Sequence, residues 1–104
     1  MPYIIVRSWY PPHKMDEVVK KYLEVLEKYP DDGSTGEQVV PVATTVSKNG
    51  YESMVVMKVE KENVGAALDA VAIEMIEYRN IEGFNYEVNT GSTAEEGLAR
   101  LGVK

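Results

Sequence analysis

Hydrophobic and polar residues follow two different periods along the chain, and the changes of period divide it into elements. Residues 3–9 (YIIVRSW) are β-branched and aromatic almost without a break, which predicts a strand buried on both faces. Over about 13–29 the apolar residues recur at intervals of three and four, which predicts a helix. Pro11 and Pro12 separate the two elements, because proline cannot donate to a sheet and can begin a helix. Residues 30–36 carry turn formers and predict a mobile loop.

Two further β-rich runs cover residues 37–47 and 51–60. A short connection that contains Asn49 and Gly50 separates them, and an Asn-Gly pair is a strong hairpin signal because both residues accept a positive φ. The two runs are therefore expected to pair as antiparallel strands. Pro41 lies inside the first run and lacks an N–H donor, which predicts that this strand is at a sheet edge or contains a bulge.

The remaining residues repeat the alternation of helix and strand. Apolar residues at helical spacing predict a second helix over about 63–79, with Asn63 as its N-cap. Residues 84–88 (FNYEV) alternate apolar and polar side chains, which is typical of a strand. Thr93 and Glu96 have the spacing of a capping box, so a short C-terminal helix is expected.

The order of these elements predicts an α+β fold of the ferredoxin-like type, βαββαβ. Right-handed crossovers give a four-stranded antiparallel sheet of order 4-1-3-2 with both helices on one face. The two central strands carry apolar side chains on both faces, so we expect a second copy to cover the helix-free face. The chain is interpreted as one domain, 1–104, with an extension at 90–104 that docks through Leu98 and Leu101 onto the sheet edge or a neighbouring protomer.

With this order and these two-faced strands, the chain resembles the dimeric α+β barrel superfamily, in which two ferredoxin-like protomers pack sheet against sheet. The resemblance spans residues 1 to about 90 and rests on the element order, the two-faced central strands and a C-terminal extension. The chain is similar in particular to the small members without an assigned role. The superfamily includes cofactor-independent monooxygenases, isomerase-like enzymes, haem-binding members and regulator domains. The resemblance implies a site between the helices and the sheet or inside the barrel, and fold alone does not select among these functions.

Composition and charge narrow the class of partner. The 104 residues include 11 Lys and Arg against 17 Asp and Glu, and the net charge of −6 repels nucleic acid and anionic lipid. The glycines form no phosphate-binding loop, and the absence of cysteine excludes thiolate catalysis and thiolate metal sites. No apolar run reaches the length of about 20 residues that spans a bilayer. We therefore expect a cytoplasmic protein without a metal, a cofactor, a nucleic-acid partner or a membrane partner.

Two polar side chains stand out as candidates for chemistry. His13 is the single histidine, and Asp16 and Glu17 follow it on the same helical face, so it is a candidate general base. The alternative is a solvent-facing first turn, where acids favour the helix N-terminus. Arg7 lies on a central apolar strand and must be paired or face a polar cavity. It is expected either to pair with Glu87, within or between subunits, or to bind an anion.

Two aromatic residues complete the candidate site. Trp9 and Tyr10 end the first strand on opposite faces, and either could stack on a ligand or serve only in packing. A ligand site is therefore expected where the first strand meets the first helix or in the adjoining barrel interior, with Arg7 as the charge anchor, His13 at the mouth and Glu87 in competition for Arg7. Five other residues are interpreted as core or interface packing: Tyr22, Met54, Met57, Met75 and Tyr78.

Two classes of function stay open at this point. One is a homo-oligomeric binding or assembly module for a small metabolite. The other is a cofactor-independent enzyme, monooxygenase-like or isomerase-like, that acts on a small polar or aromatic metabolite. A concave pocket with convergent polar groups near the candidate residues would indicate an enzyme, and a filled interior would favour the module.

Overall fold

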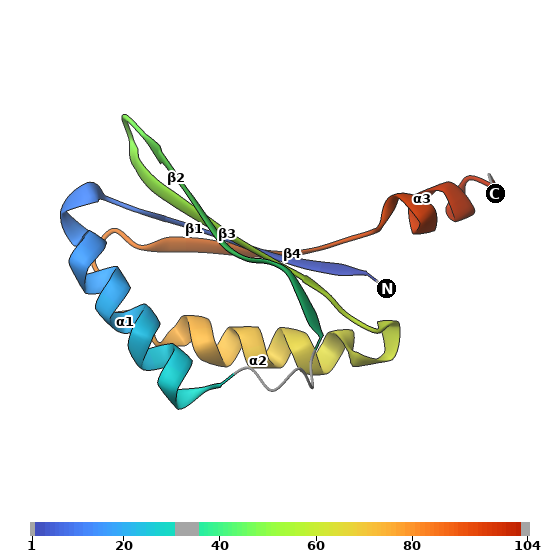
Figure 1. Ribbon diagram of the computed structural model, residues 1–104, viewed down its shortest axis with the longest axis horizontal. Coiled ribbons are helices and arrows are strands. Elements are labelled where there is room, and N and C mark those ends of the chain that lie inside the picture. The colour runs from blue at the N-terminus through green and yellow to red at the C-terminus, as the bar shows by residue number, and fades with distance from the viewer. Residues whose placement is uncertain (1, 31–35, 103–104) are drawn as a thin grey trace.

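The computed structural model describes residues 2–30 and 36–102, which form a layer of strands and a layer of helices (Figure 1). The elements are β1 (Tyr3–Tyr10), α1 (Met15–Lys28), β2 (Glu37–Ser47), β3 (Gly50–Lys58), α2 (Val64–Ile76), β4 (Asn85–Gly91) and α3 (Ala94–Arg100). Short 3-10 turns, η1 (Pro12–Lys14) and η2 (Lys61–Asn63), lead into α1 and α2. The predicted α+β class and the predicted order of elements are confirmed. The predicted mobile loop falls mainly on residues 31–35, outside the described residues.

The sheet is antiparallel, and its strand order is β2-β3-β1-β4, which becomes 4-1-3-2 when it is counted from the β4 edge. The central strands are therefore β1 and β3. At the edge, β2 changes register against β3 between Gln38 and Val40 and again between Val40 and Ala43. These shifts lie around Pro41, whose missing N–H donor interrupts a regular ladder. The edge position and the bulge expected from this proline both occur.

Alternation along β1 decides what each face of the sheet carries, because successive side chains of a strand point to opposite faces. Ile4, Val6 and Tyr10 are buried on the face toward α1 and α2, which lie on the same side of the sheet (Figure 1). Arg7 and Trp9 lie on the opposite face, where Arg7 is exposed and Trp9 is half-buried. We call this opposite side the helix-free face.

The buried residues form two clusters. The first joins β1 to α2 and consists of Ile4, Val6, Val59, Ala67 and Val71. The second joins the end of β1 to α1 and to the segment after α2, and consists of Tyr10, Val18, Val25, Tyr78 and Ile81. Ile4 and Val59 are completely buried, and complete burial of such a side chain stabilises the fold by roughly 1.5–3 kcal/mol. The two clusters therefore fix α2 and α1 to the sheet at different places.

The helices depart from the predicted pattern in three details. The first α-helix begins at Met15, because residues 12–14 form a 3-10 turn, and α2 ends at Ile76 instead of continuing to residue 79. Asn63 occupies the N-cap position of α2, but its side chain makes no capping hydrogen bond because its φ of −101° and ψ of 0° are not extended. No helix within the described ranges combines the length and the apolar character that crossing a bilayer requires.

The hairpin between β2 and β3 forms as predicted, but its turn differs in geometry. Among the described residues only glycines have a positive φ, so Asn49 does not adopt one. The Asn49 N–H donates instead to Ser47 Oγ at 3.2 Å. Gly50 has a φ of 123° and begins β3 against the end of β1, where a Cβ would lie 2.7 Å from the Tyr10 carbonyl oxygen. The glycine is therefore required both by its backbone conformation and by the close approach of β1.

The short helix α3 projects away from the two layers (Figure 1). Its predicted capping box is present: Glu96 N–H donates to Thr93 Oγ1 at 3.1 Å, and Thr93 N–H donates to Glu96 Oε1 at 2.9 Å. Leu98 is 46% exposed and Leu101 is 79% exposed. Docking of these leucines onto the sheet edge of the same chain is therefore not observed, and docking onto a neighbouring protomer stays a prediction.

Candidate functional site

A cavity of about 310 Å³ lies between the helix layer and the sheet. This volume lies at the lower end of the range of about 300–1,000 Å³ that is typical of small-molecule sites. Half of the described lining residues are aliphatic or methionine, and these come from β1, β2, β3, α1 and α2. The aromatic lining residues of the described chain are Tyr10, Tyr22, Tyr29, Tyr78 and Phe84, and the polar ones are Ser8, Gln38, Thr44, Ser53 and Glu74.

The cavity exists because short side chains lie side by side on the inward face of the sheet. Ser8 on β1 is the register partner of Ser53 on β3, and Ser53 is in turn the partner of Thr44 on β2. Most neighbouring inward positions of these strands carry larger side chains, such as Val6 and Tyr10 on β1. A row of three short side chains across three strands therefore leaves space below the helices. We call Ser8, Ser53 and Thr44 the hydroxyl row.

The hydroxyl row is linked to the aromatic part of the lining. The Ser53 hydroxyl lies 3.2 Å from Thr44 Oγ1 and 3.4 Å from Tyr10 Oη, and either atom of each pair can be the donor. Hydroxyl groups can act as both donor and acceptor, so these three linked hydroxyls can reorient and form hydrogen bonds with a ligand. The floor of an otherwise apolar cavity thus offers several adaptable polar groups.

Stacked rings form one end of the cavity. The Tyr10 and Phe84 ring centroids are 6.1 Å apart, and those of Tyr78 and Phe84 are 4.8 Å apart, both in stacked geometry. Burial raises the pKa of Tyr78 to about 12, and the neighbouring Tyr22, Glu74 and Tyr10 act in the same direction. Tyr78 is therefore protonated at neutral pH, and its hydroxyl remains available as a hydrogen-bond donor.

The first helix contributes another wall of the cavity. Val18 and Val25 reach the core, while Val19, Tyr22 and Leu26 line the cavity and are exposed. These exposed apolar side chains on α1 leave the cavity open toward solvent on this side. A ligand could enter here without a large movement of the backbone.

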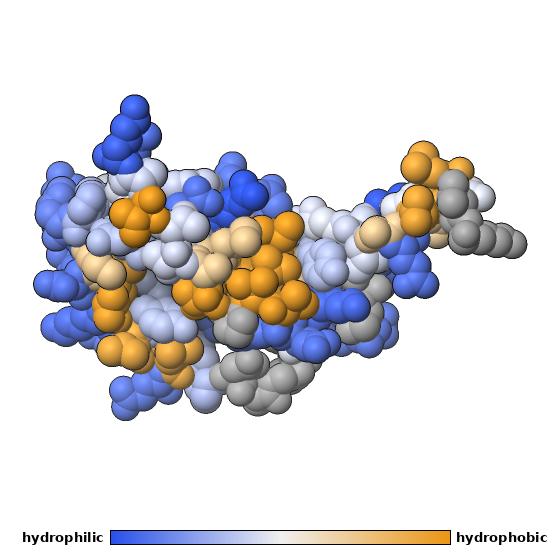
Figure 2. Space-filling view, turned by 45° about the horizontal axis from the view of Figure 1, so that its top comes forward, coloured by the Kyte–Doolittle hydropathy of each residue, from blue (hydrophilic) through white to orange (hydrophobic). Residues whose placement is uncertain are grey.

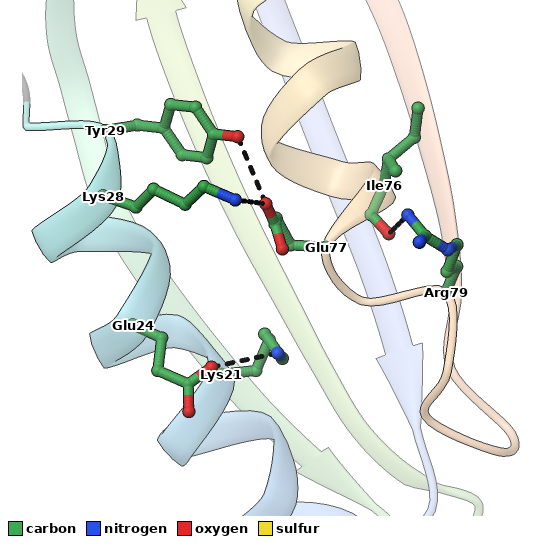
Figure 3. A network of polar contacts seen from close by, with 7 residues as sticks. All are labelled: Lys21, Glu24, Lys28, Tyr29, Ile76, Glu77 and Arg79. Carbon is green, nitrogen blue, oxygen red and sulfur yellow. Dashed lines mark hydrogen bonds and ion pairs between the residues drawn. The ribbon is translucent and has the colours of Figure 1, made fainter.

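A polar network fixes the end of α1 beside the cavity (Figure 3). Lys28 Nζ forms an ion pair with Glu77 Oε1 at 2.6 Å, and Tyr29 Oη donates to the same oxygen at 3.1 Å. The hydrogen bond from Lys28, followed by that from Tyr29, lowers the pKa of Glu77 from its ordinary value, and Glu77 raises the pKa of Lys28. Because Tyr29 lines the cavity, this network holds one of the wall residues in place.

The sheet separates the residues that the sequence proposed as one site. Tyr10 lines the cavity, whereas Arg7, Trp9 and Glu87 belong to the helix-free face. On that face Trp9 Nε1 donates to Glu52 Oε1 at 3.0 Å, so its polar atom is satisfied by the neighbouring strand. The structure therefore does not bring Arg7 and Tyr10 to one ligand.

Arg7 and Glu87 are direct register partners on β1 and β4, and both are exposed. The ion pairs within the described residues join other groups, and none of them joins these two side chains. Both charged groups are therefore accessible from outside this subunit. An ion pair between these residues of two subunits, which the sequence left open, stays a prediction.

His13 lies in η1 at the corner between β1 and α1, where its side chain is exposed. It is not one of the described residues that line the cavity. The part of the chain that the structure describes contains no group of three or more His, Cys, Asp or Glu residues that could hold a metal ion. Among the described residues, the polar chemistry of the cavity thus comes from hydroxyl groups, from the amide of Gln38 and from one carboxylate, Glu74.

Reasoning from the sequence missed the hydroxyl row and Glu74, and it interpreted Tyr22 and Tyr78 as packing. The sequence did contain a signal for the hydroxyl row. Ser8 is a short polar residue among the larger inward-facing side chains of β1, and Ser53 is one among those of β3. Its meaning depends on register, since two serines make a hollow only when they lie opposite each other. The alignment of β1 with β3 supplies that information.

Comparisons with known proteins give a fold and no function. No family model matches the chain, and no curated protein matches it either. The chain is similar to the de novo designed protein Foldit4, with a TM-score of 0.58 and 18% identity over 88% of this chain and 97% of that one. At this identity the similarity shows an α+β fold alone.

Two natural structures were also found. The first is a formyltetrahydrofolate deformylase from Pseudomonas putida KT2440, with a TM-score of 0.46 and 11% identity over 86% of this chain and 28% of that one. The second is a NIPSNAP family protein of unknown function from Agrobacterium tumefaciens str. C58, with a TM-score of 0.40 and 13% identity over 89% and 90% of the two chains. Similarity this low carries no argument about the present protein.

Proposed function

We propose that this protein is a small-molecule binding module whose ligand occupies the cavity between the helices and the sheet. We further propose that its working form is a homodimer of ferredoxin-like subunits, joined through their helix-free faces into a dimeric α+β barrel. The observation that carries the binding proposal is the hydroxyl row, Ser8, Ser53 and Thr44, below an otherwise largely apolar cavity of about 310 Å³.

The lining indicates the general chemistry of the ligand. Aliphatic and aromatic walls favour a compact apolar body, because burial of apolar surface supplies most of the affinity in such sites. The hydroxyl row and Tyr10 favour one or two hydrogen-bonding groups on that body, because a hydroxyl that already makes one hydrogen bond can still donate or accept another. An aromatic alcohol is a minimal probe with both features.

The binding proposal is tested by blocking the cavity from its rim. Val42 lines the cavity and is 42% exposed, so Val42→Trp can place an indole in the opening without overpacking the core. Val46 lies on the same strand, is 68% exposed and is not one of the lining residues, so Val46→Trp is the matched control. Binding of 2-phenylethanol is followed by NMR shifts of backbone amides.

We expect saturable shifts at cavity residues in the unmodified protein and in Val46→Trp, and their loss in Val42→Trp. A third variant, Arg7→Met, should bind like the unmodified protein because Arg7 lies across the sheet from the cavity. Absence of saturable shifts in the unmodified protein would contradict the proposal, and so would equal binding by Val42→Trp. Loss of binding in Arg7→Met would instead place the ligand on the helix-free face.

The alternative function, a cofactor-independent enzyme, would use the same cavity but requires a further chemical group. A cofactor-independent enzyme needs a proton-transferring group beside the ligand. Glu74 is the carboxylate among the described lining residues, whereas His13 is not one of them. Mass spectrometry of metabolites incubated with the protein separates the two classes: a retained compound recovered unchanged supports the module, and a chemically altered compound supports the enzyme.

The dimer proposal rests on the composition of the helix-free face. Ile5, Met54 and Val56 are half-buried in the isolated chain, and Arg7 and Glu87 lie beside them as register partners. Such a face is self-complementary, because a two-fold axis can bring Arg7 of each copy to Glu87 of the other. A second copy is therefore the occupant whose charges fit.

The overall shape of the chain also supports a second copy as the partner of the helix-free face. The radius of gyration is 15.1 Å, whereas a compact chain of this length has a value of about 13 Å. Figure 2, in which the top of Figure 1 is turned toward the viewer, shows hydrophobic side chains gathered over the middle of the molecule and again on the projecting α3. Both apolar regions would be covered more completely in a dimer than in a single chain.

A further inference from the structure

The aromatic lining of the cavity comes from separate parts of the chain. Tyr10 is on β1, Tyr22 is on α1, and Tyr78 and Phe84 lie in the segment between α2 and β4. Ring stacking joins Tyr10, Phe84 and Tyr78 into one row. Aromatic rings attract cations through their negative faces, and phenol oxygens accept hydrogen bonds from ammonium groups. Tyr10 and Phe84 each stack on two other rings, so Tyr22 and Tyr78 are the lining rings that can best stabilise a positive charge beside an apolar body.

The described lining residues carry negative charge but no positive charge. Glu74 on α2 is the ionisable carboxylate of the lining, and the described lining residues include no lysine, arginine or histidine. Glu74 also takes part in another interaction of the chain, and a carboxylate with about four lone-pair sites can accept a further hydrogen bond. Lys28 forms its ion pair with Glu77, and neither of these two residues belongs to the lining.

The field around the cavity acts in the same direction. Burial is the first cause of the raised pKa of Tyr78, and the neighbouring Tyr22, Glu74 and Tyr10 act in the same direction, so a further negative charge is unfavourable beside them. The whole chain carries a net charge of −6, which raises the local concentration of small cations and lowers that of anions. A buried carboxylate ligand would meet no cationic partner among the described lining residues, and an unpaired buried charge is strongly unfavourable.

We infer that the cavity selects an organic cation, namely a protonated amine carried on a compact aromatic or aliphatic body, over neutral and anionic ligands of the same shape. This inference rests on the proposed function and specifies its ligand class. The ammonium group lies at the end formed by Glu74, Tyr22 and Tyr78, and the apolar body extends toward the hydroxyl row.

The test compares three probes that share one body and differ in charge: phenethylamine, 2-phenylethanol and phenylacetate. Dissociation constants are measured by NMR titration at neutral pH. We expect the amine to bind about tenfold more tightly than the alcohol, because cation–π and carboxylate contacts strengthen when water is excluded. Phenylacetate should bind more weakly than the alcohol.

The matched variants are Glu74→Gln and Asp69→Asn. The first removes the negative charge of the lining at nearly constant shape, so the amine should lose most of its advantage while the alcohol binds as before. The second removes an exposed acid of the same helix, α2, that is not a lining residue, and it should leave the ratio of amine to alcohol affinity unchanged. If Glu74→Gln does not fold, Tyr22→Leu at the open side serves instead, and it should weaken the amine more than the alcohol.

The outcomes separate this inference from the proposal beneath it. Equal binding of the amine and the alcohol to the unmodified protein overturns the cation selectivity and leaves the binding module intact. An amine advantage that survives both Glu74→Gln and Tyr22→Leu also overturns it. If none of the three probes binds to the unmodified protein, the binding module itself is contradicted.

Discussion

Tyr78 connects the chemistry of single residues to the stability of the protein. It belongs to the second core cluster, stacks on Phe84 and lines the cavity. Its buried hydroxyl is neutral in the folded state up to an unusually high pH, since the pKa is raised from 10.0 to about 12. In the unfolded chain the same hydroxyl ionises near its ordinary pKa. Folding and ionisation of Tyr78 therefore oppose each other at alkaline pH.

This opposition predicts the pH dependence of stability. The folded pKa lies above the unfolded one, so the stabilisation is complete below pH 10 and is lost as the pH rises toward about 12. We expect the free energy of unfolding, measured with urea at a series of pH values, to fall over this window in the unmodified protein. Tyr78→Phe should reduce the slope there. An equal slope in both proteins would show that other groups cause the alkaline loss.

At the scale of elements, the β2–β3 hairpin depends on its contact with the end of β1. Gly50 begins β3 beneath the Tyr10 carbonyl, and β1 then pairs with β3 from Tyr10 to Tyr3. The same pairing sets Ser8 opposite Ser53 and so forms the hydroxyl row. An error at this turn would shift the register and exchange the two faces of the strand.

We predict that Gly50→Ala destabilises the protein by roughly 1–3 kcal/mol, the usual cost of a strained backbone conformation. The added Cβ would lie 2.7 Å from a backbone oxygen at a φ of 123°. Gly65 is the matched control: it lies in α2, where an added Cβ would meet no neighbouring group within 4 Å, so Gly65→Ala should stabilise by roughly 0.5–1 kcal/mol. Urea unfolding measures both. A Gly50→Ala variant as stable as the unmodified protein would contradict the close approach of β1 and β3.

At the scale of the whole molecule, one layer of helices covers only one face of the sheet. Large hydrophobic side chains remain exposed on α1, on β2 and on α3, and the helix-free face has half-buried apolar residues at its centre. Soluble monomers rarely leave several apolar regions open to water. The proposed dimer would cover the centre of the sheet, and α3 would then have a neighbouring subunit within reach.

We predict a dimer in light scattering at micromolar concentration. Val56→Asp should give a monomer or an unfolded chain, because a buried unpaired carboxylate at the centre of an interface is strongly unfavourable. Val46→Asp, at a position that is 68% exposed on the edge strand, should remain dimeric. A monomeric unmodified protein would overturn the proposal, and a dimeric, folded Val56→Asp would move the interface away from this face.

The periodicity of the sequence was sufficient for the elements and their order. A run rich in β-branched and aromatic residues located β1, and two β-rich runs around an Asn-Gly pair located β2 and β3. Three- and four-residue spacing located α1 and α2, and the pair Thr93 and Glu96 located the start of α3. These signals are local, since each depends on residues within one or two turns or along one strand. The errors were local as well: Asn63 does not cap α2, and Asn49 does not adopt a positive φ.

The candidate site was decided by tertiary structure. Proximity in the sequence grouped Arg7, Trp9, Tyr10 and His13, but the alternation of β1 and the corner at η1 direct these side chains to different surfaces. The cavity instead combines residues that are far apart in the chain, such as Ser8 with Ser53. A hollow results from the side chains that are missing at one place in a packed layer. Which short side chains meet there depends on strand register and helix placement, and no local pattern in the sequence contains that information.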